Sequence, residues 1–191
     1  LLSGAGGRDL AFDEIQYNVR SIRIEVTRVN GNTNIRCSEV YVSVGTAKAE
    51  PEVPEIPTEP VEYEFANIDS SRLTAYADST SLGSSPSNMV DGDLETQWHT
   101  NYPGEDSDSG DPFVEGNGGN LTGNNNIYIV LDEAMPVNQL SLYTNANPNA
   151  QMLSVNVYVS SEEYTKGAQL DWGEVVGSSN WTILNGAGGR D

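Results

Sequence analysis

Short runs in which every second residue is apolar constrain the fold of this chain more than any other feature. Ile22, Ile24 and Val26 alternate with polar residues, and three valines repeat the pattern over residues 40–44. Because successive side chains of a β-strand point to opposite faces, each run predicts a strand with one buried and one wet face. The predicted strands are residues 21–26, 39–44, 127–131, 139–143, 154–159 and 181–184.

The segments between these runs are rich in Gly, Asn, Ser and Pro, and no amphipathic stripe of four helical turns is present. Repeated short strands separated by such turns are typical of antiparallel sandwiches and barrels. We therefore predict an all-β fold, an antiparallel β-sandwich or barrel. The length of 191 residues suits one domain of ordinary size with additional segments.

The charge balance narrows the range of partners. Lys and Arg total 9 against 28 Asp and Glu, which gives a formal net charge of −19. Such a surface repels phosphate backbones and anionic lipid head groups, so we expect no nucleic-acid partner and no direct membrane insertion. No apolar run approaches the ~18 residues of a spanning helix, and the first residues do not resemble a signal peptide. The single cysteine, Cys37, is expected to be a buried small apolar residue.

A proline-rich segment divides the chain into two parts. Residues 50–60 carry Pro at positions 51, 54, 57 and 60, a period of three that matches the polyproline II helix. At ~3.1 Å per residue, this segment is predicted to be a stiff spacer that can hold two bodies about 30 Å apart. The predicted units are therefore residues 1–49, the linker 50–60 and residues 61–191.

The two ends of the chain repeat each other. Residues 2–9 and 184–191 agree at seven of eight positions with an offset of 182 residues. This repeat suggests slightly more than one period of a tandem array, in which residues 1–49 are the back end of a preceding module. The alternative is a circular permutation, in which residues 1–49 complete the sheet of residues 61–191 in the same chain.

One loop, residues 88–100, contains candidate metal ligands. Asp91, Asp93 and Thr96 can direct oxygens toward one centre, while Gly92 permits a tight bend. Oxygen donors of this kind are preferred by Ca²⁺, although the spacing does not match an EF-hand. The alternative is a solvated Asp-Gly turn.

Several segments together resemble the discoidin family, also called the coagulation factor V/VIII type C domain, and especially carbohydrate-binding module family 32. The resemblance covers nearly everything outside the linker, and it lies in residues 88–99, 127–132, 137–143, 155–160, 181–184, 19–26 and 37–42. The last two segments stand at the carboxyl end in the family but come first here. The resemblance implies a discoidin-like jelly roll with its carboxyl-terminal strands placed first.

The resemblance also implies one structural Ca²⁺. Mapped by motif, the ligands are the Asn88 carbonyl, the Asp91 carboxylate, the Asp93 carbonyl, Thr96 through hydroxyl and carbonyl, and the Ser38-Glu39 pair. Trp98 is then expected to pack beneath the loop, with His99 as hydrogen-bonded scaffolding.

Sugar contacts in this family come from variable loops, so they transfer only as candidates. The candidates are Tyr102, Asn145, Asn147 and Trp172. Aromatic rings cover sugar C–H faces and amides bind hydroxyl groups, which is the chemistry a glycan site needs. The alternatives are that Trp172 belongs to the core and that the asparagines only shape turns. The acidic stretch 103–126 is either a second Ca²⁺ loop or a mobile loop.

No catalytic residue is predicted, because the single histidine and cysteine lie in no recognisable nucleophile setting. The resemblance implies a non-catalytic, secreted or cell-surface adhesion module that binds extracellular glycans and lies beside neighbouring copies of itself. The alternative is a structural spacer or filament-forming repeat with no sugar ligand.

Overall fold

The computed structural model describes residues 7–30, 34–48, 61–100, 125–144 and 150–182. These residues form the strands β1 (Gly7–Val29), β2 (Arg36–Ala47), β3 (Tyr63–Asn67), β4 (Leu73–Ala77), β5 (Trp98–His99), β6 (Asn126–Thr144), β7 (Met152–Ser160) and β8 (Gly177–Asn180). Two short 3₁₀ helices, η1 (Ser70–Arg72) and η2 (Pro86–Met89), flank β4. The predicted all-β class is confirmed.

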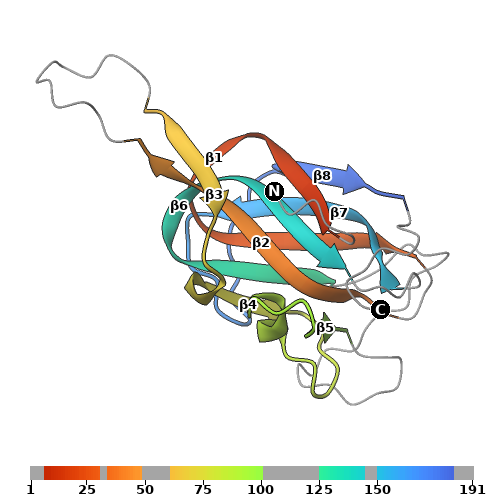
Figure 1. The fold of residues 1–191 in the computed structure, drawn as a ribbon. Coiled ribbons are helices and arrows are strands. Elements are labelled where there is room, and N and C mark those ends of the chain that lie inside the picture. Colours follow the sequence, from red (N-terminus) through yellow and green to blue (C-terminus); the bar gives the residue numbers. More distant parts are fainter. Residues whose placement is uncertain (1–6, 31–33, 49–60, 101–124, 145–149, 183–191) are drawn as a thin grey trace, which may run out of the picture.

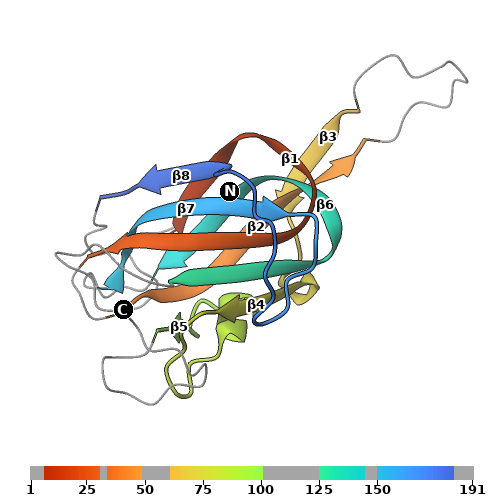
Figure 2. The ribbon, with the colours of Figure 1, turned by 180° about the vertical axis from the view of Figure 1, so that it is seen from behind.

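The strands make one curled antiparallel sheet in the order β3-β2-β6-β1-β7-β8, with β4 pairing β6 and β5 pairing β2. Figures 1 and 2 show the sheet curling so that β2 and β7 lie on different sides of the body. We call the side built from β3, β2, residues 137–144 of β6 and residues 7–11 of β1 layer A. Layer B contains β4, residues 126–131 of β6, residues 21–29 of β1, β7 and β8. The discoidin-like jelly-roll order remains a prediction.

Two strands take part in both layers because each bends at its middle. Register shifts interrupt the β1–β6 ladder at three places between Ala11 and Ser21, and Asn18 has a φ of 56° at this corner. Such bulges bend a strand and increase its twist. The predicted strands 127–131 and 139–143 are consequently the two halves of one bent strand, β6.

The predicted alternation of buried and wet side chains is confirmed. Ile22, Ile24, Val40 and Val42 are fully buried between the layers, and the residues between them lie on the outer faces. Cys37 is also buried, as predicted. At about 25 cal/mol per Å² of apolar surface removed from water, this shared core is the main stabilising contribution to the sheet.

Residues on both sides of the proline-rich segment belong to this sheet. β1 pairs antiparallel with β6 through Ser21–Val130 and with β7 through Ser21–Ser160. β2 pairs with β3, β5 and β6. β1 and β2 therefore complete the sheet formed with β3 to β8 within this one chain. The predicted linker and most of the repeated terminal segments lie outside the described residues.

One predicted strand is misplaced. Residues 177–180 form β8, whereas Trp181 and Thr182 follow the strand and residues 183–184 lie outside the described part. The Gly-Ser-Ser-Asn sequence of β8 has no apolar alternation, so its pattern gives no signal. Its placement depends on backbone pairing with β7 and on Gly177, where a Cβ would lie 2.6 Å from Leu10.

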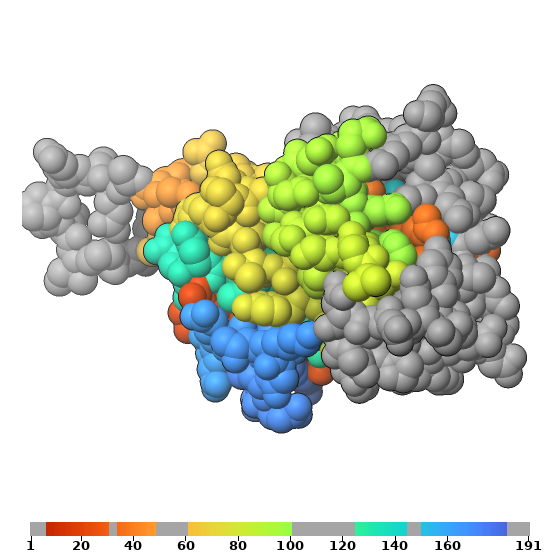
Figure 3. All heavy atoms as spheres, turned by 90° about the horizontal axis from the view of Figure 1, so that it is seen from below, coloured from red at the N-terminus to blue at the C-terminus, as the bar shows by residue number. Residues whose placement is uncertain are grey.

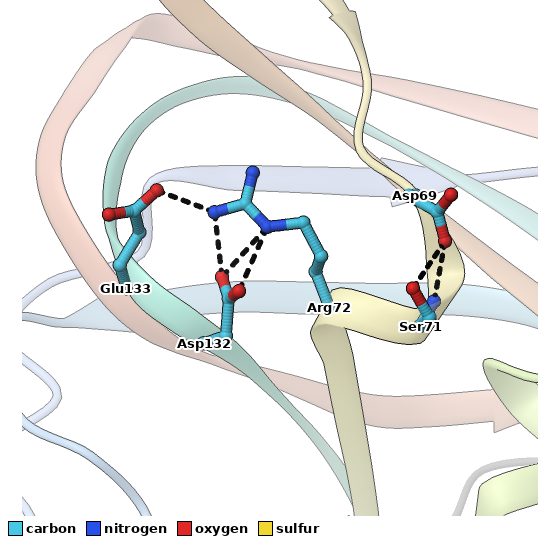
Figure 4. A network of polar contacts seen from close by, with 5 residues as sticks. All are labelled: Asp69, Ser71, Arg72, Asp132 and Glu133. Atoms are coloured by element: carbon cyan, nitrogen blue, oxygen red, sulfur yellow. Dashed lines mark hydrogen bonds and ion pairs between the residues drawn. The ribbon is translucent and has the colours of Figure 1, made fainter.

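An ion-pair network fastens η1 to the bend of β6. Arg72 Nη2 lies 2.8 Å from Asp132 Oδ1 and 2.5 Å from Glu133 Oε1, and Arg72 Nε also donates to Asp132 (Figure 4). Exposed pairs of this kind contribute only about 0–1 kcal/mol each. The network therefore positions η1, which leads into β4, and contributes little to the free energy of unfolding.

The segment from β3 to β5 covers one side of the sheet. Figure 3 shows it in yellow to green, beside the blue carboxyl-terminal segment that follows β7. Met89, Val90 and Trp98 from this segment are buried in the main core. The candidate metal loop is thus attached to the core at both of its ends.

Candidate metal centre and ligand surfaces

The loop between η2 and β5 is held by its own side chains. Asp91 Oδ1 accepts a hydrogen bond of 2.9 Å from the Asp93 N–H, and Asp93 Oδ1 accepts one of 2.8 Å from the Glu95 N–H. Gly92 has a φ of 76°, in the left-handed region that glycine adopts without strain. These turns direct Asp91 and Thr96 toward each other.

Four of the predicted ligand groups meet at the Thr96 hydroxyl. Thr96 Oγ1 lies 2.7 Å from Asp91 Oδ2, 3.0 Å from the Asp93 carbonyl oxygen and 3.3 Å from the Asn88 carbonyl oxygen. A hydroxyl has one proton, so it can satisfy only one of these three acceptors fully. The Asp93 carbonyl also accepts a hydrogen bond of 3.1 Å from the Thr96 N–H. The oxygens that surround Thr96 Oγ1 are of the type that a hard cation prefers.

Glu39 reaches this loop from β2. The β2–β6 register shifts between Cys37 and Glu39, which makes Ser38 a buried bulge residue and turns the Glu39 side chain toward the loop. Glu39 Oε1 accepts long hydrogen bonds from the Gly92 N–H at 3.4 Å and from Ser70 Oγ at 3.5 Å. Glu39 Oε2 is buried and has no hydrogen-bond partner.

The surroundings of Glu39 disfavour the charged form of its carboxylate. Burial raises its pKa to about 7, and the nearby carboxylates of Asp91 and Asp93 contribute to the rise. Among the described residues, no Lys, Arg or His forms an ion pair with Glu39. A buried carboxylate without a counter-charge is costly, and a divalent cation at Oε2 would supply that charge.

The candidate ligand set depends on mixed donors. Within the described ranges, no group of three or more His, Cys, Asp or Glu side chains could hold a metal by itself. The set formed here is two carboxylates, two carbonyls and a hydroxyl, from Glu39, Asp91, Asn88, Asp93 and Thr96. Such neutral and charged oxygen mixtures suit Ca²⁺.

Trp98 and His99 behave as scaffolding beside the loop. Trp98 is 1% exposed, and its indole N–H donates to the Ser79 carbonyl and to Thr80 Oγ1 at 3.2 Å. His99 Nδ1 lies 3.0 Å from the Thr100 carbonyl. The expected structural role of Trp98 is confirmed.

Trp172 lies in an aromatic cluster on the outer face of layer B. Its ring centroid is 5.8 Å from that of Tyr128 and 6.0 Å from that of Tyr164, and the Arg23 guanidinium lies 5.4 Å from it. Tyr128 and Tyr164 stack at 4.0 Å. Trp172 therefore contributes to a second apolar cluster, beside a hollow that Asp78 and Lys166 also line.

The sequence patterns gave no signal for the polar residues around this hollow. Asp78 accepts hydrogen bonds from the Asn126 backbone and side chain at 3.0 and 2.6 Å and from the Tyr128 hydroxyl at 2.9 Å. Burial, followed by the Asp78 charge, raises the pKa of Tyr128. These contacts connect Asp78, the residue after β4, to β6 across 48 to 50 residues, a separation that no local pattern bridges.

Three of the predicted sugar contacts cannot be placed. Tyr102, Asn145 and Asn147 lie outside the described residues. A different polar surface, on the outer face of layer A, contains Tyr41, Asn67, Asn138 and Gln139. None of these four was a candidate from sequence, because each belongs to a strand or strand edge and not to a loop.

Comparison with known proteins adds no relative to this description. No protein-family model matches the chain, and no curated protein matches its sequence.

Proposed function

We propose that this chain is a non-catalytic recognition module that binds Ca²⁺ in the Asp91 loop and glycans on its surface. The observation that carries the proposal is the grouping of Asn88, Asp91, Asp93 and Thr96 oxygens in a loop that also contacts buried Glu39, whose Oε2 has no hydrogen-bond partner. When bound, the cation would neutralise the carboxylates and join β2 to the loop. Ser38, the bulge residue, is retained as a candidate ligand next to Glu39.

Two further features support a role in recognition over a role in catalysis. Burial raises the pKa of the Cys37 thiol, with Glu39 adding to the rise, so the thiol stays neutral and inaccessible to a substrate. The outer faces of both layers carry hollows lined by aromatic and amide side chains. Such surfaces suit sugar binding.

We place the module outside the cell because millimolar Ca²⁺ suits the modest affinity of sites with few carboxylates. This location, the discoidin-like family and a tandem array on a bacterial surface protein belong to the same proposal. The charge of −19 supports partners that are neither nucleic acid nor anionic membrane. No helix in the described part of the chain has the length and apolarity to cross a bilayer.

The experiment is thermal unfolding of the chain in EDTA and in millimolar Ca²⁺. At a free concentration of about 100 times the Kd, binding stabilises a protein by ~2.7 kcal/mol. For a chain of this size, that corresponds to a melting rise of roughly 5–10 °C.

Asp91→Ala should abolish this rise, whereas Asp13→Asn, an exposed change on β1, should preserve it. Glycan binding is measured separately on a glycan array. An absent calcium response would reject the metal site, and a calcium response without any glycan binding would favour the structural spacer.

A further inference from the structure

A groove of about 400 Å³ crosses the outer face of layer A. It runs over β3, β2 and β6, strands that lie next to one another in Figure 1. The residues that matter in its lining are Tyr41, Ser43, Phe65, Asn67, Asn138 and Gln139. It lies on the sheet and not in the loops from which sugar contacts are expected.

Strand register produces this surface. Ser43 of β2 pairs with Asn67 of β3 on one side and with Gln139 of β6 on the other, so three hydrogen-bonding side chains form a row across the strands. The β2–β6 register shifts between Ser43 and Val44, where Asn138 is the extra residue on β6. This bulge adds a third amide, Asn138, beside Asn67 and Gln139.

The absence of a side chain at Gly45 leaves room for two aromatic rings beside the groove. Gly45 pairs with Phe65, and a Cβ at Gly45 would lie 3.0 Å from the rings of both Phe65 and Tyr63. The two rings therefore lie directly against the β2 backbone, which any larger residue at position 45 would prevent. The result is a half-exposed aromatic surface beside the amide row.

The polar side chains of the groove have unused hydrogen-bonding capacity. Within the described residues, the side chains of Ser43, Asn67 and Gln139 donate and accept no hydrogen bond, and neither does the Tyr41 hydroxyl. The Asn138 Oδ1 atom is buried and has no partner. An unpaired buried acceptor is destabilising. Since this oxygen has almost no exposed surface, only the rest of the Asn138 amide is available to a ligand in the groove.

Among the described residues, those that line the groove carry no charge, although the chain has 28 acidic and 9 basic residues. An anionic ligand would find no counter-ion among them and would lie near the exposed Asp9 carboxylate, to which the lining Ser141 donates a hydrogen bond, and an apolar peptide would leave the amides desolvated. Neutral polyhydroxyl ligands meet both requirements, because their hydroxyls pair with amides and their C–H faces cover aromatic rings.

The groove adjoins the metal loop. Tyr41 and Asn67 line the groove and also a neighbouring hollow that includes Asp91 and Gly92. The Tyr41 ring is itself held by an edge contact with Tyr143 at 5.6 Å. A cation that orders the Asp91 loop would therefore also restrain Tyr41 and Asn67, which line the groove.

We infer that this groove binds a neutral saccharide chain, with Asn67, Asn138 and Gln139 reading hydroxyl groups and Phe65 covering a sugar face. The inference rests on the proposed glycan-binding function and gives it a location and a ligand class. It differs from the loop candidates Tyr102, Asn145 and Asn147 and from the hollow beside Trp172.

The test uses the full chain and four soluble polysaccharides: β-glucan, α-mannan, galactan and, as the acidic comparison, polygalacturonate. Binding is measured by affinity electrophoresis in Ca²⁺ for wild type, for Asn67→Ala/Gln139→Ala and for Asn180→Ala. Asn180 is the matched control, since it is an exposed amide on β8, at the opposite edge of the sheet from β3, and lines neither the groove nor the hollow beside Trp172. Melting temperatures confirm that each variant is folded.

We expect wild type to bind at least one neutral polymer, the double variant to bind it at least tenfold more weakly, and Asn180→Ala to bind it as wild type does. Phe65→Ala should weaken binding similarly. Unchanged binding by the double variant, with loss in Tyr102→Ala/Asn147→Ala, would overturn the groove and leave glycan binding intact.

Two other outcomes would also overturn the inference. Binding of polygalacturonate alone would show that the ligand is an acidic polysaccharide and not a neutral one. Arg23 and Lys166, in the hollow beside Trp172, would then be the candidate contacts. Binding of none of the polymers, with the calcium response preserved, would reject both the groove and the glycan-binding part of the proposed function while leaving the metal site in place.

Discussion

Glu39 and Gly92 meet although 53 residues separate them: Oε1 of Glu39 accepts a hydrogen bond of 3.4 Å from the Gly92 N–H. The contact joins β2, which precedes the proline-rich segment, to the Asp91 loop, which follows it. A candidate site that would need two modules in a tandem arrangement is thus complete within one chain.

Glu39→Gln should distinguish the destabilisation caused by the buried Glu39 carboxylate from the contribution of that carboxylate to Ca²⁺ binding. In EDTA, we expect the variant to unfold at the same temperature as wild type or higher, because it removes an uncompensated buried charge. In millimolar Ca²⁺, we expect it to lose the stabilisation that wild type gains. Differential scanning calorimetry in both buffers measures the two effects. A variant that is less stable than wild type in EDTA would show that Glu39 has a structural role independent of metal.

Cutting the chain within residues 50–60 should leave one folded body. β1 pairs with β6 on one side and β7 on the other, and Ile22 and Ile24 are completely buried between the layers. After cleavage at a protease site introduced into this segment, we expect the fragments to co-elute in size-exclusion chromatography. We also expect them to unfold in one transition, and fragment 61–191 alone to show none. Cooperative unfolding of that fragment by itself would contradict the shared core.

Trp172→Ala should reduce stability whatever its effect on sugar binding. The ring contacts Tyr128, Tyr164 and Arg23 but is only partly buried, so we expect a loss of about 1–3 kcal/mol in the free energy of unfolding. Urea titration measures the change, and Trp172→Phe should recover about half of it. An unchanged urea midpoint would show that the ring contributes nothing to the cluster and would restore it as a ligand-binding candidate.

The Tyr128–Asp78 contact predicts an alkaline loss of stability. A tyrosine in the unfolded chain titrates near pH 10, and burial raises the folded-state pKa of Tyr128 above its usual value. Below pH 10 both states keep the proton, and stability is unaffected. Above pH 10 the unfolded state loses the proton first, so stability falls with rising pH.

Tyr128→Phe tests this relation. It should be less stable at neutral pH by about 1 kcal/mol, since Asp78 loses a donor, but should lose less stability than wild type between pH 9 and pH 11. Urea midpoints at these two pH values give the comparison. Equal losses in both proteins would assign the alkaline effect to other tyrosines.

The sequence predicted much of the candidate metal site but not its geometry. Asp91, Gly92 and Asp93 are neighbours, so the turn they form is determined locally and is visible in the residue types. Glu39 entered only through the family resemblance, because nothing in its own strand distinguishes it from an exposed glutamate. Its burial results from the bulge at Ser38, and bulge positions depend on the partner strand.

The sequence patterns missed β8, the role of Asp78 and the groove for the same reason: each depends on contacts between residues that are far apart in the chain. β8 has no apolar pattern, and its position is fixed by backbone hydrogen bonds to β7 and by the space above Gly177. Asp78 looks like an ordinary loop residue until Tyr128 and Asn126 bond to it. The groove beside Asn67 and Gln139 exists only after three strands are placed in register.

By itself, the sequence determined the all-β class, the inward-facing residues of β1 and β2, the burial of Cys37 and the turn at Asp91. These follow from the two-residue period of strands and from the local conformations of Asp and Gly, which act over a few residues. Only the tertiary structure decided that β1 lies between β6 and β7, that Glu39 faces Asp91, and that Tyr41 borders both the metal loop and the groove. Those relations arise from hydrogen bonding and packing between segments that are far apart in the chain, and local residue patterns carry no information about which distant segments will pair.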